Sequence, residues 1–94
     1  MFVTSERHPG ARLQRALAAG NLIAAEQAAF DVAFVPLAQA RDLVELYAQE
    51  GSPKFERAAL KYLSRYLTES EPTLADVAQV AALLAERSLM MRGL

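Results

Sequence analysis

Apolar residues recur at helical spacing in five segments of this 94-residue chain, and glycine or proline stands at most of the boundaries between the segments. Spacing of i, i+3, i+4 and i+7 places apolar side chains on one face of an α-helix. No segment alternates apolar and polar residues over a useful length, as a half-buried strand would. The pattern therefore predicts an all-α fold, either a five-helix bundle or a short α-α superhelix built of antiparallel hairpins.

The first predicted helix covers residues 9–19, and Gly20 follows it as the left-handed residue that commonly closes a helix. Asn21 is the expected N-cap of the second helix, which is predicted over residues 22–34. Pro36 ends that helix because proline disfavours the α conformation in the residue before it. The second segment is almost wholly apolar, so we expect its helix to be central or covered on several sides.

The third predicted helix covers residues 36–50 and ends at Gly51. Ser52 and Pro53 follow at once, with serine as the expected N-cap and proline in the first turn of a fourth helix over residues 53–68. Such a short connection favours antiparallel packing of the two helices that it joins.

The fifth predicted helix covers residues 73–88 and follows a polar linker. Thr73 is its expected N-cap, and Asp76 lies three residues later, which indicates a shortened capping box. The helix is expected to end near Ser88, with residues 89–94 as a flexible tail.

The length and composition are typical of one small globular domain, residues 1–94, with residues 1–8 as a second flexible tail. Apolar residues make up 53% of the chain and charged residues 22%, which disordered proteins do not show. Glu6 and Arg7 come before any apolar run could form a signal peptide, so a cytoplasmic protein without a membrane segment is expected.

Few residues that could carry catalysis or bind a metal are present, so we predict that the chain is not an enzyme and has no metal or cofactor. There is no cysteine, and the four glycines are isolated from one another, which excludes a phosphate-binding loop. His8 is the only histidine, and a solvated terminal side chain is its simplest interpretation. Among the carboxylates, Glu56 faces the apolar side of its helix, where a first-turn acid already compensates the helix dipole.

A basic stripe, Lys54, Arg57, Lys61 and Arg65, falls within an arc of about 80° on the fourth predicted helix. One interpretation is a docking surface for a phosphate backbone or an acidic partner. The other is partial neutralisation within the fold, because an antiparallel third helix would bring Asp42 near Lys61. The net charge of −1 supplies no overall attraction to nucleic acid.

The fifth predicted helix has more apolar surface than one neighbouring helix can cover, because its polar residues span only about 100°. Either two neighbours enclose this helix and its apolar residues close the core, or part of it faces another molecule. The second interpretation predicts a non-catalytic protein-interaction module that self-associates through this helix, or binds another protein there. The predicted partner-binding residues are Val80, Leu83, Leu84, Leu89, Met90 and Met91.

The segment Gly20-x-Leu22-x-x-Ala25, followed by Ala29, resembles the inner portion of a tetratricopeptide repeat. That resemblance implies a helical hairpin with small residues where its two helices cross. The pattern does not continue at Gly51, which is followed by Pro53, and the two glycines are not separated by the period of about 34 residues that such repeats show. The whole chain also resembles small, uncharacterised helical proteins of high-GC bacteria, which implies a fold and no activity.

Overall fold

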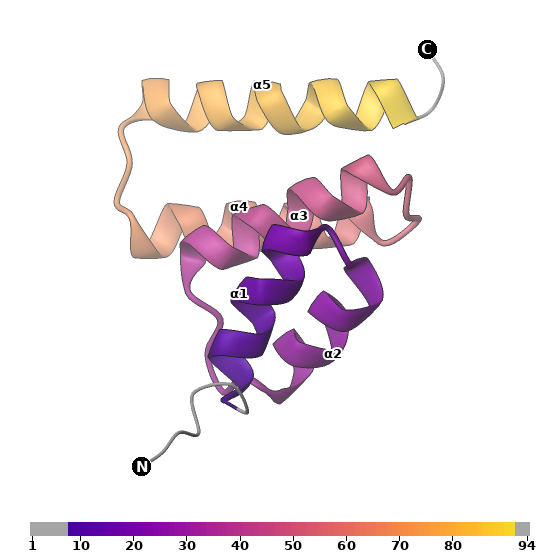
Figure 1. Ribbon diagram of the computed structural model, residues 1–94. Coiled ribbons are helices and arrows are strands. Elements are labelled where there is room, and N and C mark those ends of the chain that lie inside the picture. Colours follow the sequence, from indigo (N-terminus) through magenta and orange to yellow (C-terminus); the bar gives the residue numbers. More distant parts are fainter. Residues whose placement is uncertain (1–7, 92–94) are drawn as a thin grey trace. The chain divides into compact units, whose positions relative to one another are not determined.

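The computed structural model describes residues 8–91, and within this range the chain contains helices and no strand (Figure 1). The prediction of an all-α fold is therefore confirmed. The chain forms two compact units, one ending at Leu46 and the other beginning at Tyr47, so the division falls within the third helix. The helices are α1 (Pro9–Ala19), α2 (Leu22–Asp31), α3 (Leu37–Gln49), α4 (Phe55–Glu69) and α5 (Leu74–Met91).

The first unit contains the α1–α2 hairpin, whose turn is closed as the sequence predicts. Gly20 adopts a left-handed conformation with φ 70°, and its N–H donates to the Leu17 carbonyl. The Asn21 N–H donates to the Ala16 carbonyl, which completes a Schellman motif. The Asn21 side chain then caps α2 by accepting the Ala24 N–H at 3.1 Å. Both predicted roles, the closing glycine and the asparagine cap, are confirmed.

His8 caps α1, a role that the sequence analysis missed. The Gly10 N–H donates to His8 Nδ1 at 3.1 Å, so the imidazole takes the place of the usual serine or aspartate acceptor. At the same end of the hairpin, the Arg12 guanidinium donates to the Asp31 carboxylate at 3.2 Å. This exposed ion pair joins the start of α1 to the end of α2.

Small side chains make up most of the core of the first unit. Leu13 has no exposed surface and is the largest fully buried side chain. The other buried members of this cluster are Ala16, Ala25, Ala28 and Leu46. Alanine at the crossing lets the backbones of α1 and α2 approach closely, and Leu46 from α3 covers one side of the hairpin.

α2 ends at Asp31, three residues earlier than predicted. The N–H of Val32 still bonds to the Ala29 carbonyl, but Val32 itself is extended, with ψ 128°. Val32 and Val35 both pack against the core of the first unit. Pro36 disfavours the α conformation in the residue before it, which accounts for a non-helical backbone at Val35.

The outer face of α2 is exposed, so the expectation of a central helix covered on several sides is wrong. Ile23, Phe30 and Phe34 are all exposed, and 92% of the Phe30 surface is accessible. The apolar composition of this segment does not reflect burial, because only its alanine-rich side meets α1.

The second unit begins with the end of α3, which closes as predicted. Gly51 has φ 63°, its N–H donates to the Ala48 carbonyl, and the Ser52 N–H donates to the Tyr47 carbonyl. α4 does not restart at Pro53, however, and begins at Phe55. The Ser52 hydroxyl and carbonyl accept the N–H groups of the two residues after Pro53, and these bonds close a turn before the helix begins.

α4 and α5 form an antiparallel hairpin (Figure 1). The predicted capping box at the start of α5 is confirmed. The Asp76 N–H donates to Thr73 Oγ1 at 3.1 Å, and the Thr73 N–H donates to the Asp76 carboxylate at 3.3 Å. At the other end of the hairpin, Ser88 Oγ donates to Glu56 Oε1 at 2.8 Å, which gives this acidic residue a structural role.

The end of α5 differs from the sequence prediction. The helix continues to Met91, so residues 89–91 are helical and do not belong to a tail, whereas residues 92–94 lie outside the described range. Residues 1–7 of the predicted N-terminal tail also lie outside the described range. Among the described residues, no helix combines the length and the apolar character needed to cross a membrane.

Candidate functional site

One face of α5 meets α4, and its residues are half-buried. They recur at three- and four-residue intervals, and Ser88, which bonds to Glu56 of α4, is one of them. No residue of this 18-residue helix is fully buried. The half-buried residues are Val77, Val80, Ala81, Leu84, Ser88 and Met91.

Away from the face that meets α4, α5 exposes large apolar side chains. The accessible fraction is 58% for Leu83 and 66% for Met90, and Leu74 and Leu89 are also exposed. At 100° per residue, Leu83 and Met90 lie about 20° apart on the helix circumference, so they share one strip, whereas Leu74 and Leu89 lie on another side. Single exposed apolar residues are normal on protein surfaces, so the feature to explain is that two large ones share a strip.

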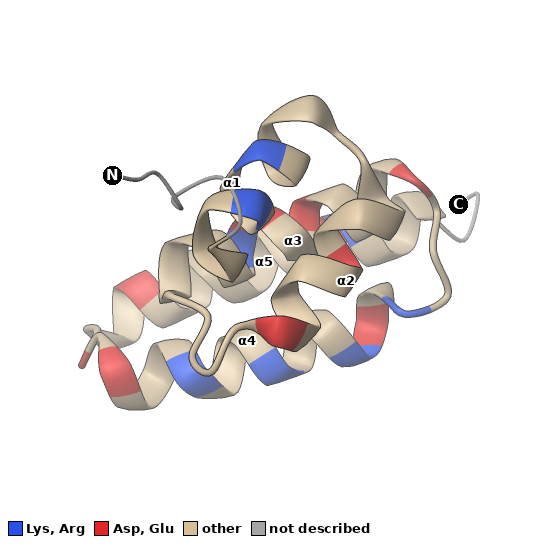
Figure 2. Ribbon diagram, turned by 60° about the horizontal axis from the view of Figure 1, so that its bottom comes forward, with Lys and Arg blue, Asp and Glu red and all other residues tan. Residues whose placement is uncertain are grey.

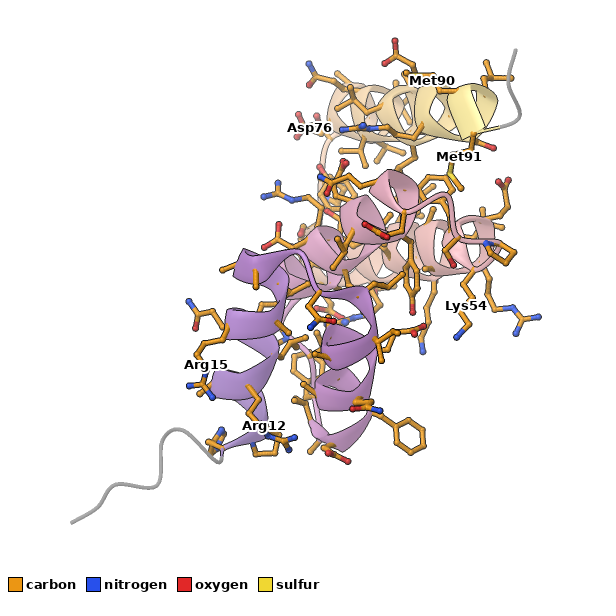
Figure 3. All side chains as sticks on the ribbon, turned by 45° about the vertical axis from the view of Figure 1, so that its right-hand side comes forward. Arg12, Arg15, Lys54, Asp76, Met90 and Met91 are labelled. Carbon is orange, nitrogen blue, oxygen red and sulfur yellow. The ribbon has the colours of Figure 1, made fainter. Side chains whose placement is uncertain are left out.

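The six predicted partner-binding residues therefore divide between two faces of α5. Leu83, Leu89 and Met90 are exposed, and the other three lie on the half-buried face. Met90 and Met91 point to different sides of the helix (Figure 3). The structure brings Leu83 and Met90 together as one exposed pair. Val80 lies at the border between this pair and the face that meets α4.

Charged residues share the strip with Leu83 and Met90: Asp76 precedes Leu83, and Arg87 lies between the two apolar residues. Asp76 lies near the N-terminal end of α5 and Arg87 near the C-terminal end, and both share the strip that carries the two apolar side chains. All four residues are exposed. Helical periodicity alone places both on the same side of α5 as Leu83, because they lie seven and four residues from it.

The basic stripe on α4 is partly neutralised, by a residue of its own helix. Lys54, Arg57 and Lys61 are exposed, and positive charge recurs along α4 (Figure 2). Arg65 is half-buried and binds both carboxylate oxygens of Glu69, at 2.7 and 3.2 Å. The i, i+4 spacing of Arg65 and Glu69 is the sequence signal for this pair, and it places an acidic residue at the end of the stripe. Beside it, the rings of Tyr62 and Tyr66 stack with centroids 6.1 Å apart.

The Arg65–Glu69 pair has a measurable consequence for ionisation. The hydrogen bonds from the Arg65 guanidinium, together with its charge, lower the pKa of the Glu69 carboxyl below its usual value. A lowered pKa in the folded chain means that this pair stabilises the fold above the usual titration range. The stabilisation is lost as the pH falls through the lowered pKa.

We expect Arg65→Met to return the pKa of Glu69 towards the ordinary glutamate value, because this substitution removes both the hydrogen bonds and the charge. Carboxyl chemical shifts of Glu69, followed by NMR across an acid titration, measure the change. Lys61→Met is the matched control, since it removes a cation of the same stripe that makes no bond to Glu69. An equal rise of the Glu69 pKa in both variants would contradict a specific Arg65–Glu69 contact.

A shallow depression of about 380 Å³ in the second unit is lined by residues 48–51 and by the last turns of α5. Its charged lining residues are Glu50 and Arg87, and Met90 and Met91 supply apolar surface. Paired carboxylates or an acid beside a nucleophile, the usual basis of acid–base catalysis, are not found in this lining. Within residues 8–91, no three side chains of histidine, cysteine, aspartate or glutamate are grouped closely enough to hold a metal ion.

Comparison with protein-family models, with curated proteins and with solved structures found no match to this chain. The resemblances to tetratricopeptide repeats and to small helical proteins of high-GC bacteria therefore stay predictions.

Proposed function

We propose that this chain is a non-catalytic protein-interaction module that associates with a second copy of itself through α5. The observation that carries the proposal is the pair Leu83 and Met90, which lies exposed on one strip of a helix that has no fully buried residue. A helix that met only its hairpin partner would not need large apolar residues on that strip.

The size of the apolar pair predicts a weak association. Fully burying one leucine or methionine side chain contributes about 1.5–3 kcal/mol, and a two-fold dimer buries two copies of each. Association also costs translational and rotational freedom. We therefore expect a weak dimer with Kd of about 10–100 µM, which corresponds to about 5.5–7 kcal/mol remaining after that cost.

The chemistry of the described residues supports an interaction role more than a catalytic one. The depression beside Arg87 offers a single carboxylate, that of Glu50, and it is open and shallow. His8, the residue that catalysis would most often use, is bound to the start of α1 as its N-cap.

Sedimentation equilibrium of the full chain between about 1 and 300 µM tests the proposal, since this range brackets the expected Kd. We expect the average mass to rise from that of a monomer towards that of a dimer. A monomer mass over the whole range would rule out self-association.

We also propose a second, less favoured function, the binding of a nucleic-acid backbone by the basic stripe. The observation behind it is that Arg57 and Lys61 are exposed on one face of α4, with Lys54 one turn before. Three phosphate contacts would give a slope of about −3 for the logarithm of the binding constant against the logarithm of the salt concentration.

Fluorescence anisotropy with a labelled DNA or RNA duplex at several salt concentrations measures that slope. Charge reversal by Lys54→Glu with Lys61→Glu should abolish the binding, whereas Arg41→Glu, a charge reversal at an exposed position on α3, should retain most of it. Absence of binding to either duplex at the lowest salt concentration would exclude this function.

A further inference from the structure

The exposed strip of α5 has the spacing of a coiled-coil seam. Asp76, Val80, Leu83, Arg87 and Met90 follow one another at intervals of four, three, four and three residues. This is the heptad spacing at which two helices pack side by side. Val80 and Leu83 form an apolar centre, an acidic residue precedes them and a basic residue follows them, and Met90 ends the seam.

We propose that the second copy packs on this seam in the antiparallel orientation, about a two-fold axis that passes between residues 81 and 82. This inference rests on the self-association proposed above and adds its register. The register places Val80 of one copy opposite Leu83 of the other, at the centre. It places Asp76 of one copy opposite Arg87 of the other, once at each end.

Charge complementarity selects this orientation over the parallel one. Parallel packing in register would set Asp76 against Asp76 and Arg87 against Arg87 of the second copy, and like charges at an interface disfavour a complex. The antiparallel arrangement converts both contacts into ion pairs. It also places the N-terminal end of each helix dipole beside the C-terminal end of the other. The charges therefore set the direction of packing, and the apolar centre supplies the attraction.

The residues beside the seam fit the same arrangement. Gln79 comes close to Glu86 of the second copy, where the amide can donate to the carboxylate. On the other side, Val77 comes close to Leu84 of the second copy, so apolar groups meet next to the α4–α5 hairpin. Both residues of the second pair are half-buried by α4 within one chain. The seam therefore continues the apolar interior of the hairpin.

Both charged residues have hydrogen-bonding groups beyond those needed for a single contact within the chain. Asp76 uses one carboxylate oxygen, Oδ2, to accept the Thr73 N–H, which leaves Oδ1 for a cation. Arg87 has an interaction of its own within the chain, but a guanidinium carries five N–H donors in a fork that suits a carboxylate.

The neighbouring alanine-rich face of α5 does not compete with the seam as the contact surface. Its members Ala75, Ala78, Ala82 and Ala85 are exposed, and Leu74 and Leu89 lie at its two ends. Most of this face is alanine, which is favoured in a helix without any partner. This face also lacks charges that could orient a second copy.

Charge-reversal variants test the register by sedimentation equilibrium of the full chain. Asp76→Arg and Arg87→Asp should each raise the dimer Kd by about tenfold or more, because each single variant sets like charges together at both ends. The double variant should return the Kd to within about threefold of the wild-type value, since the pairs are restored with exchanged signs. An equimolar mixture of the two single variants should form heterodimers about as tightly as the wild type. Asp42→Arg, the same charge change on α3, is the control and should leave the Kd unchanged.

Asp76→Arg also removes a residue of the capping box at the start of α5. Arg87→Asp therefore serves as an independent test of the ion pair. This variant leaves the Thr73–Asp76 capping box intact, and added salt should tighten its dimer while weakening that of the wild type. Two results would overturn the antiparallel register in a chain that does dimerise. One is a dimer that Arg87→Asp leaves unchanged or tightens, and the other is a double variant no better than the weaker single variant. A wild type that stays monomeric would instead remove the proposed self-association itself.

Discussion

Replacing Leu13 with alanine is expected to lower the free energy of unfolding by about 3–5 kcal/mol, the upper part of the range for buried leucines. Leu13 has no exposed surface and lies at the centre of the first unit. Its buried neighbours on α1 and α2 are alanines, whose side chains cannot extend into the space that the substitution leaves. The cavity therefore stays open, and small domains have little stability to lose.

Chemical denaturation followed by circular dichroism at 222 nm measures this change. Phe30→Ala is the matched control, because it removes a larger apolar side chain from a position that is 92% exposed. We expect the control to change the free energy of unfolding by less than about 0.5 kcal/mol. Equal losses in the two variants would contradict the assignment of Leu13 to the core and Phe30 to the surface.

The second large effect is expected at the surface of α5. Leu83→Glu should raise the dimer Kd by about a hundredfold or more, because the two-fold arrangement places a carboxylate from each copy in the apolar centre of the contact. Met90→Glu should have a smaller effect, since Met90 lies at the end of the seam. Light scattering and sedimentation at a concentration where the wild type is dimeric measure both changes.

Leu60→Glu provides a closely matched control for this prediction. Leu60 lies on α4 and is 62% exposed, against 58% for Leu83, and the change in side chain is identical. The control should keep the wild-type Kd, and circular dichroism should show that both variants keep their helices. If Leu60→Glu also disrupts the dimer, the contact does not depend on α5 alone.

The helix boundaries that depend on local hydrogen bonds were predicted correctly. Gly20 and Gly51 close α1 and α3 with left-handed backbone conformations, and Asn21 and Thr73 cap α2 and α5. Each of these motifs involves residues within five positions of one another, so a short stretch of sequence is enough to specify the helix boundary. The type and order of the helices followed from the same local information together with apolar spacing.

The boundaries that depend on packing or on competing turns were predicted less well. α2 ends three residues earlier than predicted, and Val32 and Val35 in the non-helical segment after it pack on the core of the first unit. The start of α4 shifted because Ser52 closes a turn with Pro53 at its centre instead of capping the helix directly. After Asp31 the sequence pattern is compatible with a continued helix or an extended segment, and at Pro53 it is compatible with a helix or a turn. The pattern alone does not distinguish these alternatives.

The sequence by itself determined that the chain is helical, where most helices are capped, and that α5 carries more apolar surface than one neighbour covers. Only the tertiary structure decided which part of that surface stays exposed, because exposure depends on which face of α5 meets α4. It assigned Val80, Leu84 and Met91 to the half-buried face and left Leu83 and Met90 outside, beside Asp76 and Arg87. The physical reason is that helical periodicity specifies the angle between side chains on one helix, whereas a contact between helices selects which of those angles faces inward.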